Sequence, residues 1–240
     1  MTENKTANRT SDRGHSAFFA AVRTIVWKDL RIERHTRQTL SVMVMFSLVT
    51  VVMFNFALEA DLAAARKVAT GLLWSTILLA GTLGLNRSLG IEQENQTVDA
   101  ILIAPIERGA IYLGKVISVT LFSLMLETFL VFIFIIFFNK PFWRPQVLLI
   151  LVLGTIGYIA AGVLVASMTI QTRTRAVLLP VLLLPLSLPL VLPASMAVAT
   201  YMFPQLPDWR EVQSPVALVI IYDLLMLATG FSTYHYVVES

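Results

Sequence analysis

Six apolar stretches dominate this chain, and each is long enough to cross a lipid bilayer as a helix. A helix rises about 1.5 Å per residue and the hydrocarbon layer is about 30 Å thick, so about 17–25 apolar residues span it. Because lipid offers the backbone no hydrogen-bond partners, only helices and closed barrels cross it, and continuous apolarity favours helices. The predicted spans are Leu40–Ala57, Val68–Leu85, Val116–Phe138, Val147–Ile170, Ala176–Phe203 and Pro215–Val238. The sequence therefore predicts an all-α, polytopic membrane protein with six transmembrane helices.

The composition supports this class and limits the chemistry that the chain can carry. Hydrophobic residues make up 57% of the 240 residues and charged residues 14%, whereas soluble domains average about 25% charged residues. The chain has no cysteine, which excludes disulfides, thiolate metal sites and cysteine nucleophiles. The segment Gly109–Lys115 matches a phosphate-binding loop, but Val116 follows it in place of Ser or Thr, and a membrane span begins there. We therefore expect no nucleotide site, no bound metal and no enzymatic activity in this chain.

The polar region before the first span predicts a tail and then a helix on the membrane surface. Residues 1–16 are polar and are predicted to be disordered, so the membrane domain is expected to cover residues 17–238. Between residues 19 and 30, apolar side chains recur at helical spacing with basic residues between them. This pattern is typical of an interfacial amphipathic helix on anionic lipid, and equally of the ordinary basic flank of a first span.

The distribution of basic residues predicts the orientation of the chain. Thirteen of the eighteen Lys and Arg residues fall in the N-terminal region and in the loops at 87–115 and 171–175. Because basic residues accumulate on the cytoplasmic side of membrane proteins, these segments are predicted to face the cytoplasm. Six spans then place both termini in the cytoplasm.

The loop at residues 87–115, between the second and third spans, has the pattern of a short amphipathic helix. Apolar side chains recur about one helical turn apart, acidic residues favour the start of the helix, and a proline ends it. Such a helix just beneath the membrane can dock in a groove of another protein, or it can pack on the ends of its own spans. The candidate docking residues are Val98, Asp99, Ile101, Leu102 and Pro105.

Three charged residues within or beside the spans are candidates for a function inside the membrane. Glu127 lies near the middle of the third span, where an acidic residue costs about 3 kcal/mol on insertion. Such carboxylates usually face the bundle interior or a water-filled path, and the alternative is a structural hydrogen bond. Asp223 in the sixth span has the same two interpretations. Arg87, at the inner end of the second span, can extend to lipid phosphates.

The fifth predicted span, residues 176–203, contains several prolines. Each proline removes a backbone donor and bends the helix. The prolines predict either a permanently bent helix or a broken helix that forms part of a transport site. They are Pro180, Pro185, Pro189 and Pro193.

Several short motifs resemble those of the CcmB family of membrane subunits. The motifs are Lys28-Asp29-Leu30-Arg31 with Arg34-His35, Gly71-Leu72-Leu73-Trp74, Asn86-Arg87, Thr97–Pro105, Gly114-Lys115 and Leu184–Leu190. The similarity covers residues 17–238, and the order and spacing of the motifs are specific.

This resemblance implies an ABC-2-like permease of the cytochrome c maturation system without an ATPase domain of its own. It implies a separate CcmA-like ATPase that binds ATP, with the loop at residues 87–115 as the coupling helix seated on it. It also implies a CcmC-like heme-handling subunit, a CcmE-like heme chaperone and a homodimer or pseudo-dimer of permeases in the bacterial inner membrane. Heme is then a cargo of the complex, and this chain binds no cofactor directly. None of the three histidines, His15, His35 and His235, is expected to be a membrane-embedded axial ligand.

Two other functions fit the residues. An ABC-2-type exporter of a drug, lipid or polysaccharide would share the same spans and docking loop. An ATP-independent secondary transporter or channel would use Glu127 as its proton or ion site.

Overall fold

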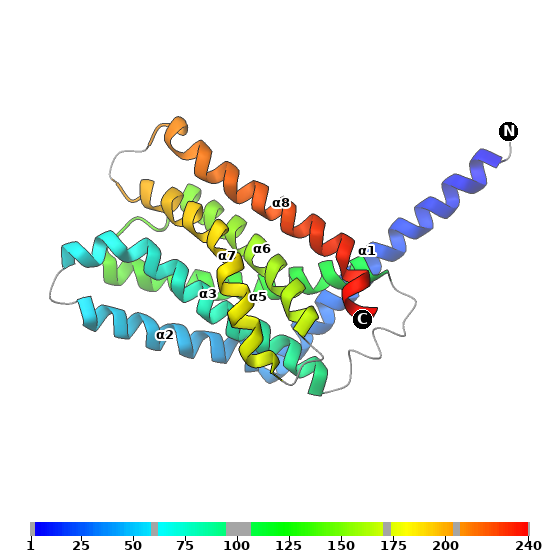
Figure 1. The fold of residues 1–240 in the computed structure, drawn as a ribbon, viewed down its shortest axis with the longest axis horizontal. Coiled ribbons are helices and arrows are strands. Elements are labelled where there is room, and N and C mark those ends of the chain that lie inside the picture. Colours follow the sequence, from blue (N-terminus) through cyan, green and yellow to red (C-terminus); the bar gives the residue numbers. More distant parts are fainter. Residues whose placement is uncertain (1–2, 59–61, 95–106, 170–173, 204–206, 240) are drawn as a thin grey trace.

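The computed structural model describes residues 3–58, 62–94, 107–169, 174–203 and 207–239. Those residues form seven helices and no strand: α1 (Glu3–Thr36), α2 (Gln38–Leu58), α3 (Leu62–Glu94), α5 (Arg108–Phe138), α6 (Pro145–Thr169), α7 (Arg175–Thr200) and α8 (Trp209–Glu239). Every helix except α1 carries a segment long and apolar enough to cross a membrane. Figure 1 shows these six helices gathered in one bundle. The predicted all-α fold with six candidate spans is confirmed.

The centre of the bundle is formed by α3 and α6. Buried residues make up 67% and 72% of their apolar segments, against 17% in α2 and 22% in α8. Glycines on α6 allow this central placement, because Trp74 of α3 packs on Gly154 and Leu85 packs on Gly162, where a Cβ atom would overlap the neighbouring side chain. In lipid no hydrophobic force drives helices together, so close contact over small residues supplies the packing.

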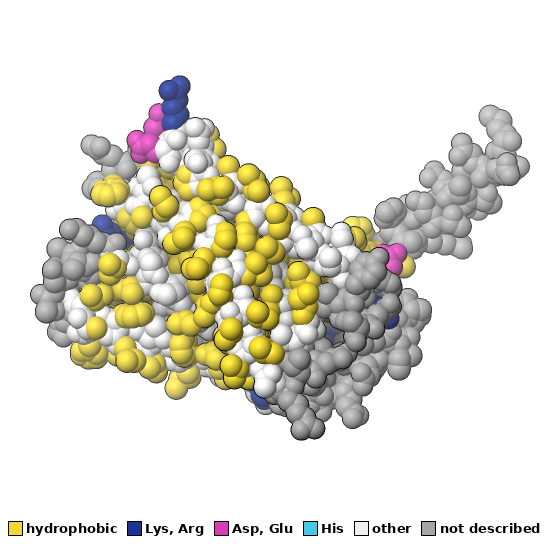
Figure 2. All heavy atoms as spheres, in the orientation of Figure 1, with side chains coloured by type: hydrophobic (Ala, Val, Ile, Leu, Met, Phe, Trp, Pro, Cys, Tyr) yellow, Lys and Arg dark blue, Asp and Glu magenta, His cyan; other side chains and the backbone are white. Residues whose placement is uncertain are grey.

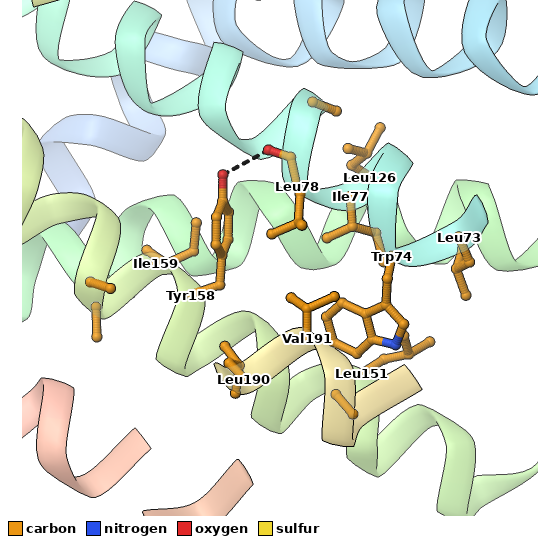
Figure 3. Packing of buried hydrophobic residues seen from close by; sticks show 14 of the residues in the cluster. Leu73, Trp74, Ile77, Leu78, Leu126, Leu151, Tyr158, Ile159, Leu190 and Val191 are labelled. Carbon is orange, nitrogen blue, oxygen red and sulfur yellow. Dashed lines mark hydrogen bonds between the residues drawn. The ribbon is translucent and has the colours of Figure 1, made fainter. Parts of the chain in front are cut away.

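A cluster of buried side chains links α3, α5, α6 and α7 through this centre (Figure 3). The hydroxyl of Tyr158 on α6 donates a 2.7 Å hydrogen bond to the carbonyl oxygen of Leu78 on α3. Figure 3 also shows Val191 of α7 beside the indole ring of Trp74. A polar contact embedded in close packing fixes the position of α3 along α6, because sliding would leave the buried hydroxyl unpaired.

The helix α7 continues without a break through all four of its prolines. Figure 1 shows that its axis bends between its two ends. A proline removes one hydrogen bond and crowds the preceding turn, which bends a helix when neighbouring helices hold it in place. The structure thus agrees with the permanently bent helix and shows no break within α7.

The outer faces of the bundle are apolar. Figure 2 shows hydrophobic side chains over the face formed by α7 and α8, with charged side chains toward its ends. Leu182 and Leu192 of α7 and Leu224 and Leu225 of α8 are among the exposed residues on these helices. A continuous apolar surface of this kind is unfavourable in water and suits contact with lipid.

The helix α1 is only partly packed on the bundle. Its helical backbone starts at Glu3, and Figure 1 shows its first half projecting from the bundle. The expected disorder of residues 1–16 stays a prediction. Among the described side chains, contact with α8 begins near the predicted start of the membrane domain, where the rings of Phe18 and Phe231 lie 6.2 Å apart.

Candidate functional site

The predicted docking face lies outside the residues that the structure describes. This applies to Val98, Asp99, Ile101, Leu102 and Pro105. The structure does describe the helices on either side of this segment, α3 as far as Glu94 and α5 from Arg108. We call residues 107–115, the first described residues after this segment, the α5 start.

A buried ion pair joins the α5 start to α1. The Nζ atom of Lys115 lies 2.9 Å from Oδ2 of Asp29, and the two side chains are only 4% and 5% exposed. Lys28 lies 3.2 Å from the other oxygen of Asp29 and is more exposed. One residue before Lys115, Gly114 packs closely on Ile25 of α1. Because a buried charge without its partner is strongly unfavourable, this pair fixes α1 on α5.

Tyr112 joins the α5 start to α6 and α8. Its hydroxyl donates to the carbonyl oxygen of Ala160 on α6 at 3.0 Å and to that of Met226 on α8 at 3.3 Å. Its ring lies over Gly230, where a Cβ atom would overlap it, and its centroid is 5.5 Å from that of Tyr234. The α5 start thus contacts α1, α6 and α8 within two helical turns.

The α5 start is held by α1, α6 and α8, so a displacement of this segment would have to be accommodated by all three helices. The sequence alone does not pair Asp29 with Lys115, which are 86 residues apart. A lysine at the edge of an apolar span was the one sequence feature that could have indicated a buried ion pair.

The second half of α3 is linked to α2 by Arg87. Its guanidinium donates to the Oε1 atom of Gln38 at the start of α2. We predicted that Arg87 reaches lipid phosphates, and the structure adds this protein partner. Glu33 of α1 stabilises the same end of α2, because its carboxylate accepts hydrogen bonds from the backbone N–H groups of Thr39 at 3.2 Å and Leu40 at 2.8 Å.

The two acidic candidates inside the membrane differ in their partners. The hydroxyl of Thr155 on α6 donates to Glu127, which is buried. Asp223 is also buried, and neither of its carboxylate oxygens has a hydrogen-bond partner among the described residues. It packs against Gly157 of α6, where a Cβ atom would overlap its carboxylate. Since Thr155 and Gly157 lie on nearly opposite sides of α6, the two acids do not form one site.

Removing these two interactions should have different effects on stability. Replacing Thr155 by Val should lower the free energy of unfolding by about 1–3 kcal/mol, because it leaves Glu127 without its donor. Replacing Asp223 by Asn should change it by less than about 1 kcal/mol, because no bond is lost. Denaturant unfolding in detergent, followed by circular dichroism, measures both. A larger loss for Asp223→Asn than for Thr155→Val would contradict this assignment.

In the described part of the chain, no group of three or more His, Asp or Glu side chains is arranged to hold a metal ion. His35 is exposed, and its Nδ1 atom lies 3.0 Å from the carbonyl oxygen of Arg31. The side chains of His15 and His235 lie outside the described set.

Comparisons with known proteins match most of the chain. The model of the family described as CcmB protein matches residues 20–231. The heme exporter protein B of Rhodobacter capsulatus is 26% identical over 171 residues, which cover 70% of this chain and 78% of that protein. Those of Bradyrhizobium diazoefficiens and Pseudomonas aeruginosa are also 26% identical, over 72% and 61% of this chain and 78% and 66% of their own lengths. The chain has six candidate spans, with α3 and α6 at the centre of the bundle, and it belongs to the CcmB family.

Proposed function

We propose that this chain is the permease subunit of an ABC transporter complex for cytochrome c maturation. It couples ATP hydrolysis in a CcmA-like partner to a rearrangement of membrane helices, which exports or delivers heme at the outer face of the bacterial inner membrane. Membership of the CcmB family and the name of the relatives, heme exporter protein B, support this proposal.

The observation that carries the proposal is the position of the α5 start. It begins shortly after Pro105, the last of the predicted docking residues, and it is held by the Asp29–Lys115 ion pair to α1 and by Tyr112 to α6 and α8. A force applied by a partner to the loop would move several spans together. In this proposal the CcmA-like partner binds and hydrolyses ATP.

The proposed complex contains further subunits. We expect a homodimer or pseudo-dimer of permeases, a CcmC-like heme-handling membrane subunit and a CcmE-like heme chaperone. Both termini of this chain face the cytoplasm, and so does the side on which α1 meets the α5 start. The basic residues of α1 favour that side of the membrane.

Deletion of the gene, followed by staining of membrane proteins for covalently bound heme, tests this function. We expect selective loss of c-type cytochromes, restored by the wild-type chain and absent again when the partner ATPase is inactivated. Normal c-type cytochromes, together with loss of resistance to a drug or loss of a surface polysaccharide, would instead indicate an exporter of another substrate. Transport that persists without the ATPase and is lost in Glu127→Gln would indicate a secondary transporter.

A further inference from the structure

A groove lies where α1, α2 and α5 meet, on the side of the α1–α2 junction. It holds about 620 Å³ and opens to the surface of the bundle. Its lining comes from all three helices: Leu30, Glu33, Arg34 and Arg37 from α1 and the junction, Leu40, Ser41, Val44 and Met45 from α2, and Phe122 and Met125 from α5.

The lining separates into a basic end and apolar walls. Arg34 and Arg37 form the basic end, and in the described part of the chain no carboxylate makes an ion pair with either one. Glu33 also lines the groove, but its carboxylate accepts hydrogen bonds from the backbone at the start of α2. Two guanidinium groups at the end of an apolar groove match a ligand with one anionic head and apolar chains.

The backbone at Arg37 strengthens this assignment. Its φ angle is 51°, in the left-handed region where glycine or asparagine is favoured over a long side chain. Its N–H donates to the carbonyl oxygen of Glu33 at 2.7 Å, which ends α1, and its own carbonyl accepts from Ser41 at 3.1 Å. An arginine at a position that suits glycine indicates that its side chain has a role, and that side chain lines the groove.

The apolar walls continue into the surface that faces lipid. Met45 is 64% exposed and Met125 is 57% exposed, and both lie on spans. Acyl chains of the surrounding bilayer therefore have direct access to the groove from the side. The two arginines directly precede the candidate span Gln38–Leu58, and basic side chains that flank a span reach the lipid phosphates.

We propose that this groove binds one anionic phospholipid from the leaflet on the side of α1. Its phosphate is held by Arg34 and Arg37, and its acyl chains lie along Val44, Met45 and Met125. The lipid would fill the space between α1 and the first span and so stabilise the junction that supports the α5 start. This site does not depend on which cargo the transporter moves.

Native mass spectrometry of the full chain tests the site. The chain is purified in mild detergent with equal amounts of phosphatidylglycerol and phosphatidylcholine. We expect the wild-type chain to retain phosphatidylglycerol in preference to phosphatidylcholine. In the double variant Arg34→Gln/Arg37→Gln, the ratio of retained phosphatidylglycerol to retained phosphatidylcholine should fall about tenfold, because each basic residue near anionic lipid contributes separately. The matched control is Arg31→Gln, because Arg31 stacks on Trp27, 4.9 Å from its ring centroid, and does not line the groove. Val44→Trp should reduce retention of both lipids by filling the groove.

The proposal is overturned if the Arg34→Gln/Arg37→Gln variant retains the preference, or if Arg31→Gln reduces it as strongly. A second measurement on the wild-type chain removes any dependence on how the variants fold. A phosphatidylglycerol analogue with a photoactivatable acyl chain should label peptides that contain Met45 or Met125. Labelling confined to other spans would rule the lipid out. Cross-linking across the groove to a second copy of the chain, or to another subunit, in place of lipid would also rule it out.

Discussion

Replacing Ile101 by Asp should separate ATP hydrolysis from the work of the membrane subunit. The change places a charge in the middle of the proposed docking face, where loss of a buried apolar anchor typically costs about 2 kcal/mol or more, or roughly 30-fold in affinity. The six spans are unaffected, so the amount of chain inserted in the membrane should equal that of wild type. We expect the yield of the ATPase in a detergent pull-down and the level of c-type cytochromes both to fall at least about tenfold.

The matched control for this prediction is Gln96→Asp. It adds the same charge to the same loop, but residue 96 lies off the face formed by Ile101 and Leu102 if the segment is helical. It should leave complex recovery within about twofold of wild type. Unchanged recovery of the complex with Ile101→Asp would show that the docking face is elsewhere.

Replacing Lys115 by Met should be the most destabilising single change among the polar residues described above. It removes the buried partner of Asp29 and leaves only the more exposed Lys28 beside that carboxylate, and removing one member of a buried ion pair typically costs about 3–5 kcal/mol. Because Lys115 lies in the α5 start, we also expect weaker coupling in the fraction that folds. Titration of the purified chain with sodium dodecyl sulfate, followed by circular dichroism, gives the change in unfolding free energy.

Two variants show whether the cost comes from the unpaired charge. Asp29→Leu combined with Lys115→Met removes both charges and should recover at least about 2 kcal/mol relative to Lys115→Met alone. Lys28→Met removes the more exposed contact of Asp29, and it should cost less than about 1 kcal/mol. If the double change is as damaging as the sum of its parts, the ion pair does not hold α1 on α5.

The six spans were predictable because apolarity over the thickness of a bilayer has few structural solutions. The ends of the helices were less predictable. The third span was expected to begin at Val116, but α5 begins at Arg108, because Tyr112 and Lys115 find partners on neighbouring helices. Hydropathy counts these side chains as polar and cannot detect that their polar atoms are satisfied inside the protein.

The candidate site was predictable only in part. The apolar stripe along α1 was predicted to lie on the membrane surface, and its Phe19 is exposed, whereas the buried residues of α1 among the described side chains are Ile25, Asp29 and Glu33, which the sequence did not indicate. Two acidic residues on a packed face contradict a rule based on hydrophobicity alone. They are buried because Lys115 and the first N–H groups of α2 supply donors, and these partners are distant in sequence or belong to the backbone.

The two intramembrane acids show a similar limit. Their presence in the spans could be read from the sequence, but their partners depend on the angle at which α5 and α8 meet α6. The structure gives Glu127 a hydroxyl donor from Thr155 and places Asp223 against a glycine with no donor among the described residues. Asp223 is therefore the acid whose carboxylate has no hydrogen-bond partner among the described residues, and the sequence did not distinguish it from Glu127 in this respect.

Cross-linking from a single cysteine tests most directly whether the partner ATPase drives this chain through the loop before α5. The chain has no cysteine of its own, so Ile101→Cys introduces a single thiol. Asp208→Cys introduces a single thiol just before α8, at the end of the bundle opposite the α5 start (Figure 1). The measurement uses right-side-out membrane vesicles, in which an impermeant maleimide reaches only the outer face of the membrane. We predict that Ile101→Cys cross-links to the ATPase and is not labelled by the maleimide. We predict that Asp208→Cys is labelled by the maleimide and does not cross-link to the ATPase. Labelling of Ile101→Cys from outside, or its failure to reach the ATPase, would contradict the proposed coupling.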